Sequence, residues 1–138
     1  MNFVAFEHAF EYPFDARGTR VPALRFRVSS PPSREQGVDV FAALDTGAER
    51  SIFVGELAPA IGLDLLGGRT MEFRSAAGLT VATRLHKVRF EHEVLEPMEL
   101  EVAFSTGALS RNLLGRDFFE LFQVGFREQW MEFYLSQE

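Results

Sequence analysis

The tripeptide Asp45-Thr46-Gly47 is the part of the chain whose residue types best suit catalysis. It directly follows an apolar run, residues 40–44, which predicts a buried strand that ends at the carboxylate. Gly47 lets the backbone approach closely, so that its amide can donate a hydrogen bond to that carboxylate. Two such carboxylates in contact would share one proton, because both cannot ionise at low cost. The ionised carboxylate could then activate a water molecule while the protonated one polarises a carbonyl group.

Asp-Thr-Gly is also ordinary turn chemistry between two strands, so the tripeptide alone is a weak signal. Its surroundings favour the catalytic interpretation. Ala48 and Ser51 follow it and lead into the apolar pair Ile52-Phe53. Far downstream, Leu113-Leu114-Gly115 again runs from apolar residues into a glycine. The chain holds one Asp-Thr-Gly triad, so a site that needs two carboxylates must be shared between two copies.

The two segments together resemble the retropepsin-like aspartic proteases, and the chain looks closer to the cellular and bacterial members of that family than to the viral ones. The resemblance covers most of the chain and implies a single domain over residues 1–138. The implied fold is all-β, a half-barrel with one or two short helices that is closed by homodimerisation. The implied function is that of a homodimeric aspartic endopeptidase, which hydrolyses peptide bonds with a water activated by Asp45 of each copy. Its partners would be a second copy of itself and a peptide or protein substrate, without a cofactor.

By position, the resemblance makes Asp45 the catalytic aspartate and assigns the rest of its loop to Thr46, Gly47 and Ala48. In the family, the threonine reaches across the dimer and locks the two loops together. A hairpin that closes over the substrate, the flap, falls on four small residues: Ser75, Ala76, Ala77 and Gly78. Viral flaps carry several glycines where this one has a single glycine, so we expect a stiffer flap.

Four residues are expected to support the catalytic loop: Glu49, Leu114, Gly115 and Arg116. Leu114 and Gly115 match the element that packs beneath that loop in the family. Glu49 and Arg116 suggest a buried ion pair, since a guanidinium can bond a carboxylate and a backbone carbonyl in one planar fork. The alternative is a solvated Arg116 at the surface. Asp117, near a helix N-terminus, is expected to cap the helix rather than to act as a second catalytic acid.

Two other functions are compatible with these residues. The first is a retropepsin-fold module that dimerises or binds peptide without cleaving it. The intact Asp45 favours the protease. The flap departs from the viral pattern, and this departure leaves the non-cleaving module open. The second is a β-barrel binding domain in which Asp-Thr-Gly occurs by chance, and it would not require a dimer.

The composition bounds the partners of the chain. A net charge of −6 and a sequence pI near 5.1 argue against binding to nucleic acid, because no basic patch is available to neutralise phosphates. The absence of cysteine excludes disulfides and thiolate chemistry. The three histidines do not have the spacing of a metal site, so we expect no bound metal. No signal peptide and no run of ~20 apolar residues is present, so we expect a cytoplasmic location without a membrane span.

Alternating and apolar patterns predict a largely β organisation. Strands are expected at residues 3–12, 22–28, 38–44, 70–74, 79–85, 87–90 and 98–104, with a terminal hairpin formed by residues 124–126 and 130–135. Short helices are expected over residues 56–62 and from near Gly115, where apolar residues recur at helical spacing up to Phe122. The proline-rich residues 29–37 predict a loop that forms the exposed tip of a hairpin and not a binding loop. The 15 phenylalanines predict either a large apolar core or a core together with an apolar interface.

Overall fold

The computed structural model describes residues 3–74, 78 and 80–137, and in these the chain consists mainly of strands. The strands are β1 (His8–Glu11), β2 (Ala23–Ser30), β3 (Ser33–Leu44), β4 (Ile52–Phe53), β5 (Arg69–Arg74), β6 (Thr80–Glu91), β7 (Met98–Ser105), β8 (Asn112–Leu114), β9 (Phe122–Arg127) and β10 (Glu132–Gln137). The helical segments are short: α1 (Leu57–Ala60), η1 (Leu65–Gly67), α2 (Arg116–Phe119) and η2 (Glu128–Trp130). The prediction of an all-β chain with short helices is confirmed.

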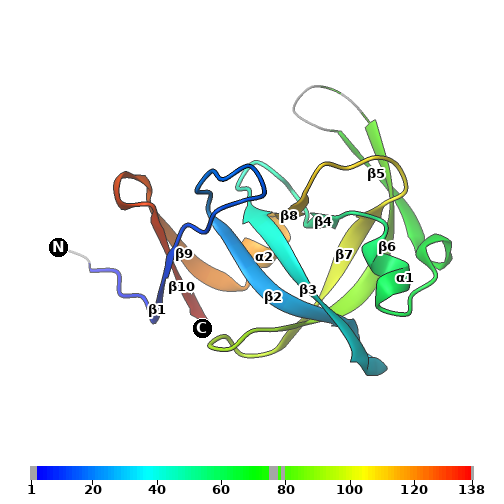
Figure 1. Ribbon diagram of the computed structural model, residues 1–138, viewed down its shortest axis with the longest axis horizontal. Helices are drawn as coiled ribbons and strands as arrows, with labels where there is room; N and C mark the ends of the chain where they lie inside the picture. Colours follow the sequence, from blue (N-terminus) through cyan, green and yellow to red (C-terminus); the bar gives the residue numbers. More distant parts are fainter. Residues whose placement is uncertain (1–2, 75–77, 79, 138) are drawn as a thin grey trace.

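Most of the strands form one sheet in the order β2-β3-β8-β4-β7-β6-β5. Strand β2 also pairs with β6, so that the sheet closes on itself as a barrel and leaves β5 at its edge (Figure 1). Most neighbouring strands are antiparallel, but β3 pairs with β8 and β4 pairs with β7 in parallel. Parallel neighbours need a long connection, and here the β3–β8 pairing brings residues 42–44 beside residues 112–114.

The N-terminal and C-terminal strands meet in a second sheet, in the order β1-β10-β9, which lies beside the barrel in Figure 1. The predicted terminal hairpin is confirmed, with Met131 in a left-handed conformation (φ 53°) just before β10. Strand β10 buries Phe133 and Leu135 completely. Both belong to the same core cluster as Leu44 and Leu114. The terminal sheet therefore contributes to the same core as β3 and β8.

Phenylalanine rings fill the centre of the barrel. Phe53 has no exposed surface, and its ring centroid lies 5.8 Å from that of Phe104, 6.1 Å from that of Phe90 and 6.2 Å from that of Phe26. Phe90 extends this cluster to Phe118 on α2, with centroids 6.4 Å apart. Tilted and edge-to-face rings at such separations attract one another beyond the effect of burial alone. The high phenylalanine content therefore serves the core to a large extent.

The loop predicted over residues 29–37 is shorter in the structure. Strand β2 continues to Ser30 and β3 begins at Ser33, so the chain reverses direction at Pro31-Pro32. Ser29 and Ser30 are buried, because β2 at this point also pairs with β6. The predicted extent of the loop was wrong, because pairing with other strands, and not local polarity, decides where a strand ends. The predicted hairpin tip is confirmed at Pro31-Pro32.

The region around residue 86 also differs from the sequence pattern. The pattern predicts separate strands over residues 79–85 and 87–90, but a single strand, β6, extends from Thr80 to Glu91. His86 continues the ladder opposite Val102 of β7. A histidine interrupts the apolar alternation without interrupting the backbone pairing.

The second helix is shorter than its apolar spacing predicts. Helix α2 ends at Phe119, and Phe122 already belongs to β9, where it lies opposite Gln137 of β10. The apolar residue at position 122 therefore reflects a strand and not a further helical turn. Within the described residues, no helix has the length and the apolar character needed to cross a membrane.

We expect Phe53→Ala to lower the free energy of unfolding by about 3–5 kcal/mol, because it leaves a cavity among rings that are themselves buried. Phe14→Ala is the control, since the Phe14 side chain is 61% exposed and lies near the guanidinium of Arg20. Its loss should cost under about 1 kcal/mol. Urea unfolding followed by circular dichroism measures both values, and equal losses would contradict the described core.

Candidate active site

Asp45 lies where β3 ends, and backbone hydrogen bonds set its position. Its amide donates to the carbonyl oxygen of Leu114 on β8, at 2.9 Å. Its Oδ1 accepts a hydrogen bond from the Gly47 amide at 2.9 Å, and its carbonyl oxygen accepts one from the Ala48 amide at 3.2 Å. In the resulting turn Asp45 is half-buried, whereas Thr46 and Gly47 are exposed. The carboxylate is thus held on a rigid base while the tip of its loop faces outward.

The Asp45 loop rests on the segment that joins β8 to α2. A Cβ atom on Gly115 would lie 2.5 Å from the backbone carbonyl carbon of Arg50 and 2.7 Å from the carbonyl oxygen of Ala48. Any larger side chain at position 115 would therefore push the loop away. The amide of Arg116 donates to the same Ala48 carbonyl at 2.8 Å, and Leu114 is fully buried beneath. The structure thus places Leu114 and Gly115 in contact with the loop or directly below it.

A buried hydrogen-bond cluster joins the far end of the loop to α2. Ser51 is fully buried, and both its amide and its Oγ donate to Oδ1 of Asp117, each at 2.8 Å. The Ser51 Oγ in turn accepts a hydrogen bond from the Gly115 amide at 3.0 Å. Oδ1 of Asp117 also accepts from the Phe118 amide at 2.8 Å, within the first turn of its own helix. The carboxylate expected only to cap α2 therefore also holds the loop.

The expected buried pair of Glu49 and Arg116 is not formed. Both residues are exposed, and among the described residues no ion pair joins them. The backbone amide of Arg116 and the carboxylate of Asp117 already connect the loop to the helix. A buried guanidinium would add a desolvation cost to contacts that are already made. The alternative of a solvated Arg116 describes the structure correctly.

Asn112, at the start of β8, is a structural link that the sequence pattern did not reveal. Its Oδ1 accepts a hydrogen bond from the Val54 amide at 2.8 Å, and its Nδ2 donates to the Phe41 carbonyl at 3.2 Å. One side chain therefore joins β3, β8 and the segment after β4. The only signal in the sequence is a polar residue at the head of the apolar pair Leu113-Leu114.

The flap expected from the sequence falls between β5 and β6. Ser75, Ala76 and Ala77 lie outside the described residues. Gly78 is exposed and has a φ of +80°, a left-handed conformation that favours glycine. The flanking strands pair in register from Arg69↔Leu85 to Arg74↔Thr80.

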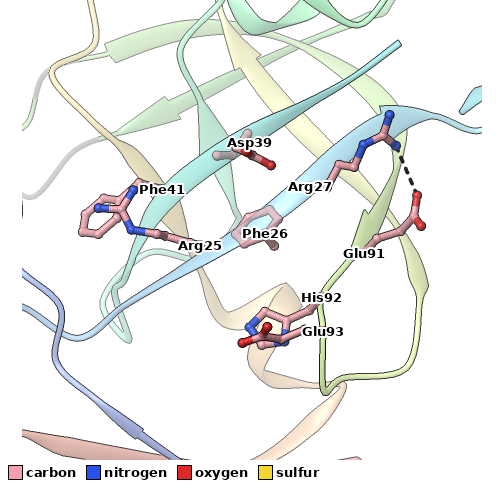
Figure 2. Close-up of a pocket in the computed structure, with 9 residues that line it drawn as sticks. Arg25, Phe26, Arg27, Asp39, Phe41, Glu91, His92 and Glu93 are labelled. Carbon is pink, nitrogen blue, oxygen red and sulfur yellow. Dashed lines mark hydrogen bonds and ion pairs between the residues drawn. The ribbon is translucent and has the colours of Figure 1, made fainter. Parts of the chain in front are cut away.

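A separate hollow of about 610 Å³ lies on the outer face of β2 and β3 (Figure 2). Both of its arginines have partners within it. Arg27 pairs with Glu91 at 3.4 Å, and the Arg25 guanidinium lies 4.9 Å from the centre of the Phe41 ring. Burial lowers the pKa of His92 at its margin. The described part of the chain contains no group of three or more histidine, aspartate or glutamate side chains placed to hold a metal ion.

Comparison with known proteins relates this arrangement to one family. Residues 34–120 match the family described as gag-polyprotein putative aspartyl protease. A retropepsin-like aspartic protease from Rickettsia conorii has a TM-score of 0.64 at 16% identity, over 98% of this chain and 96% of that one. The EIAV protease, solved in complex with the inhibitor HBY-793, has a TM-score of 0.55 at 16% identity, over 73% of this chain and 86% of that one. No curated protein sequence matches the chain. The predicted retropepsin-like fold is confirmed, and its homodimerisation stays a prediction.

We expect Asp117→Ala to destabilise the fold and Arg116→Ala to leave it nearly unchanged. Removing the Asp117 carboxylate leaves the Ser51 and Phe118 donors without their acceptor, which should cost about 1–3 kcal/mol for a buried group. Arg116 is exposed, so its loss should cost under about 1 kcal/mol. Thermal unfolding of both variants measures the difference. A larger loss of stability for Arg116→Ala than for Asp117→Ala would support the buried pair of Glu49 and Arg116 and contradict the structure.

Proposed function

The chain belongs to the gag-polyprotein putative aspartyl protease family, since residues 34–120 of its 138 match it, and on that basis we propose that it is a homodimeric aspartic endopeptidase. In this proposal Asp45 is the catalytic residue, and Thr46, Gly47 and Ala48 complete its loop. Leu114 and Gly115 support the loop from below. The substrate is a peptide or a protein, and no cofactor takes part.

The observation that carries the proposal is the placement of Asp45. The residue directly follows strand β3. Its amide donates a hydrogen bond to β8, and one of its carboxylate oxygens accepts a hydrogen bond from the Gly47 amide. The turn that follows exposes Thr46 and Gly47, so a second copy of the loop can approach. A catalytic carboxylate needs both rigid support and access from outside. A turn that merely connected two strands would need neither.

Two copies are required because each chain contributes one Asp-Thr-Gly triad. A self-complementary contact around a two-fold axis places equivalent residues opposite each other. With Asp45 close to that axis, two carboxylates come within hydrogen-bond reach. They then share one proton, since two negative charges at contact distance repel strongly.

The chemistry follows from this shared proton. The ionised carboxylate removes a proton from a water molecule as the water oxygen attacks the carbonyl carbon of the peptide bond. The protonated carboxylate donates a hydrogen bond and then its proton to the carbonyl oxygen. The tetrahedral intermediate breaks its bond to nitrogen when the leaving amine receives a proton from one carboxyl group, while the other, ionised carboxylate takes back a proton from a hydroxyl group of the intermediate as the carbonyl group forms again. The two carboxylates return to their initial state.

The hairpin of β5 and β6 is proposed as the cover of the substrate. Its tip corresponds to the expected flap, Ser75, Ala76, Ala77 and Gly78, of which Gly78 is described. Strand β5 is the edge of the barrel sheet, so a peptide can reach this side without displacing a strand.

We expect Asp45→Asn to lower the rate of peptide hydrolysis by at least about a hundredfold, because the amide keeps the shape of the side chain but cannot transfer the proton. Asp39→Asn, an exposed position on the same strand, is the control and should cleave like the wild type. The wild-type rate should be bell-shaped in pH with an acidic optimum. Cleavage of a denatured protein, followed by mass spectrometry at several pH values, measures all three. Full activity of the Asp45→Asn variant would remove Asp45 from the mechanism.

We expect light scattering to give twice the mass of the 15.6 kDa chain at micromolar concentration. The Asp45→Asn protein should also be a dimer, because the substitution removes repulsion between the facing carboxylates. A dimer that binds peptides but never cleaves them would identify the non-catalytic module. A monomer at both neutral and acidic pH would contradict the shared site.

A further inference from the structure

A hollow of about 590 Å³ is lined in part by Ala43, two residues before Asp45. Four parts of the chain contribute to it: the turn before β2 with Asp15 and Arg17, strand β3 with Ala43, the segment after β4 with Val54, and the segment leading into β8 with Arg111. Successive side chains of a strand point to opposite faces. Ala43 and Asp45 are two residues apart, so the hollow lies along the face of β3 that leads to the proposed catalytic carboxylate.

The second wall of the hollow is tied to the same base. Ala43 pairs with Leu113 in the parallel β3–β8 ladder. Asn112, which also lines the hollow, fixes the start of β8 through its bonds to Phe41 and Val54. Arg111 directly precedes Asn112, so its backbone is held close to a fixed residue. The hollow and the carboxylate share one rigid support.

The arginines of this hollow are not partnered in the way that Arg25 and Arg27 of Figure 2 are. Among the described residues, neither Arg17 nor Arg111 forms an ion pair within 4.0 Å. Asp15 lies near both, but its Oδ1 accepts from the backbone amides of Arg17 and Thr19 at 2.9 and 3.0 Å. Chiefly the bond from Thr19, and to a smaller extent the charges of Arg17 and Arg111, lower the pKa of Asp15. The hollow thus contains two guanidiniums and one carboxylate, on a chain whose net charge is −6.

We propose that this hollow is a substrate subsite that accepts an acidic side chain, Asp or Glu, through Arg17 and Arg111. The proposal rests on the proposed function, since it concerns the peptide that Asp45 would cleave. A guanidinium presents a planar fork of donors that matches a carboxylate. Both arginines are exposed, so the attraction is screened by salt and acts mainly on the choice between substrates.

The test uses two fluorescein-labelled pools of random decapeptides, identical except that one carries Glu where the other carries Gln. We expect wild-type kcat/KM to be roughly tenfold higher for the Glu pool, since hydrogen bonds to a charged group are the stronger ones. In the double variant Arg17→Glu/Arg111→Glu the ratio should fall to one or below. A ratio within one variant is not affected by partial misfolding. The control is Arg34→Glu, which is exposed at the opposite end of β3 and should keep the wild-type ratio.

A parallel measurement of fluorescence anisotropy with Asp45→Asn, with and without the two arginine substitutions, records binding without cleavage. Cleavage with equal rates for both pools, or a preference that survives in the double variant, overturns the subsite and leaves the protease standing. Binding of the Glu pool that depends on the arginines, without any cleavage by the wild type, supports the acidic site and overturns the protease. If the wild type does not cleave either pool and the Asp45→Asn protein shows no Glu-dependent binding, both the subsite and the protease are overturned.

Discussion

The parallel pairing of β3 with β8 is the contact on which the proposed site depends. Residues 42–44 lie opposite residues 112–114, and the ladder continues beyond the end of β3, since the Asp45 amide donates to Leu114. On its other side β3 is paired with β2 over most of its length. Asp45 therefore leaves the sheet from a strand that is bonded along both edges. Such a position suits a carboxylate that must meet a second one within hydrogen-bond distance, because a small displacement would separate them.

Beneath the loop, the structure uses a cluster of hydrogen bonds where an ion pair was expected. Oδ1 of Asp117 accepts three hydrogen bonds, two of them from Ser51. Its Oδ2 is buried and has no hydrogen-bond partner among the described residues. Burying an unpaired oxygen costs free energy, and the three bonds to Oδ1 offset that cost, since bonds to a charged group contribute about 1.5–3 kcal/mol each. These bonds fix the position of the loop relative to α2. The exposed side chain of Arg116 makes no such contribution.

The sequence predicted the parts of this molecule that depend on local pattern. The apolar run before Asp45, the alternation in β5 and β7, and the terminal hairpin each became an element at the expected place. The errors arose where distant strands decide the outcome. Ser29 belongs to a strand and not to the predicted loop, because β2 finds a second partner in β6 there, and Asn112 acquired its role only when β3 and β8 came together. The buried ion pair expected for Arg116 was wrong for a similar reason. The direction of each side chain at the start of α2 decides which residue contacts the loop, and it is Asp117 that bonds to Ser51. Spacing along the chain does not fix that direction.

The same barrel combines a rigid base with a weaker edge. Among the described residues, β5 pairs with β6 alone and closes the sheet order at one end. Its half-buried residues Met71 and Phe73 pack on a small apolar cluster around Ile52 that is separate from the main core. An element with one bonded edge and few buried contacts opens at a lower free energy than one in the centre of the sheet. Movement at β5 would therefore leave the β3–β8 ladder intact. In the proposed enzyme this separation lets a peptide enter from the edge while Asp45 keeps its position, which one uniformly packed core would not allow.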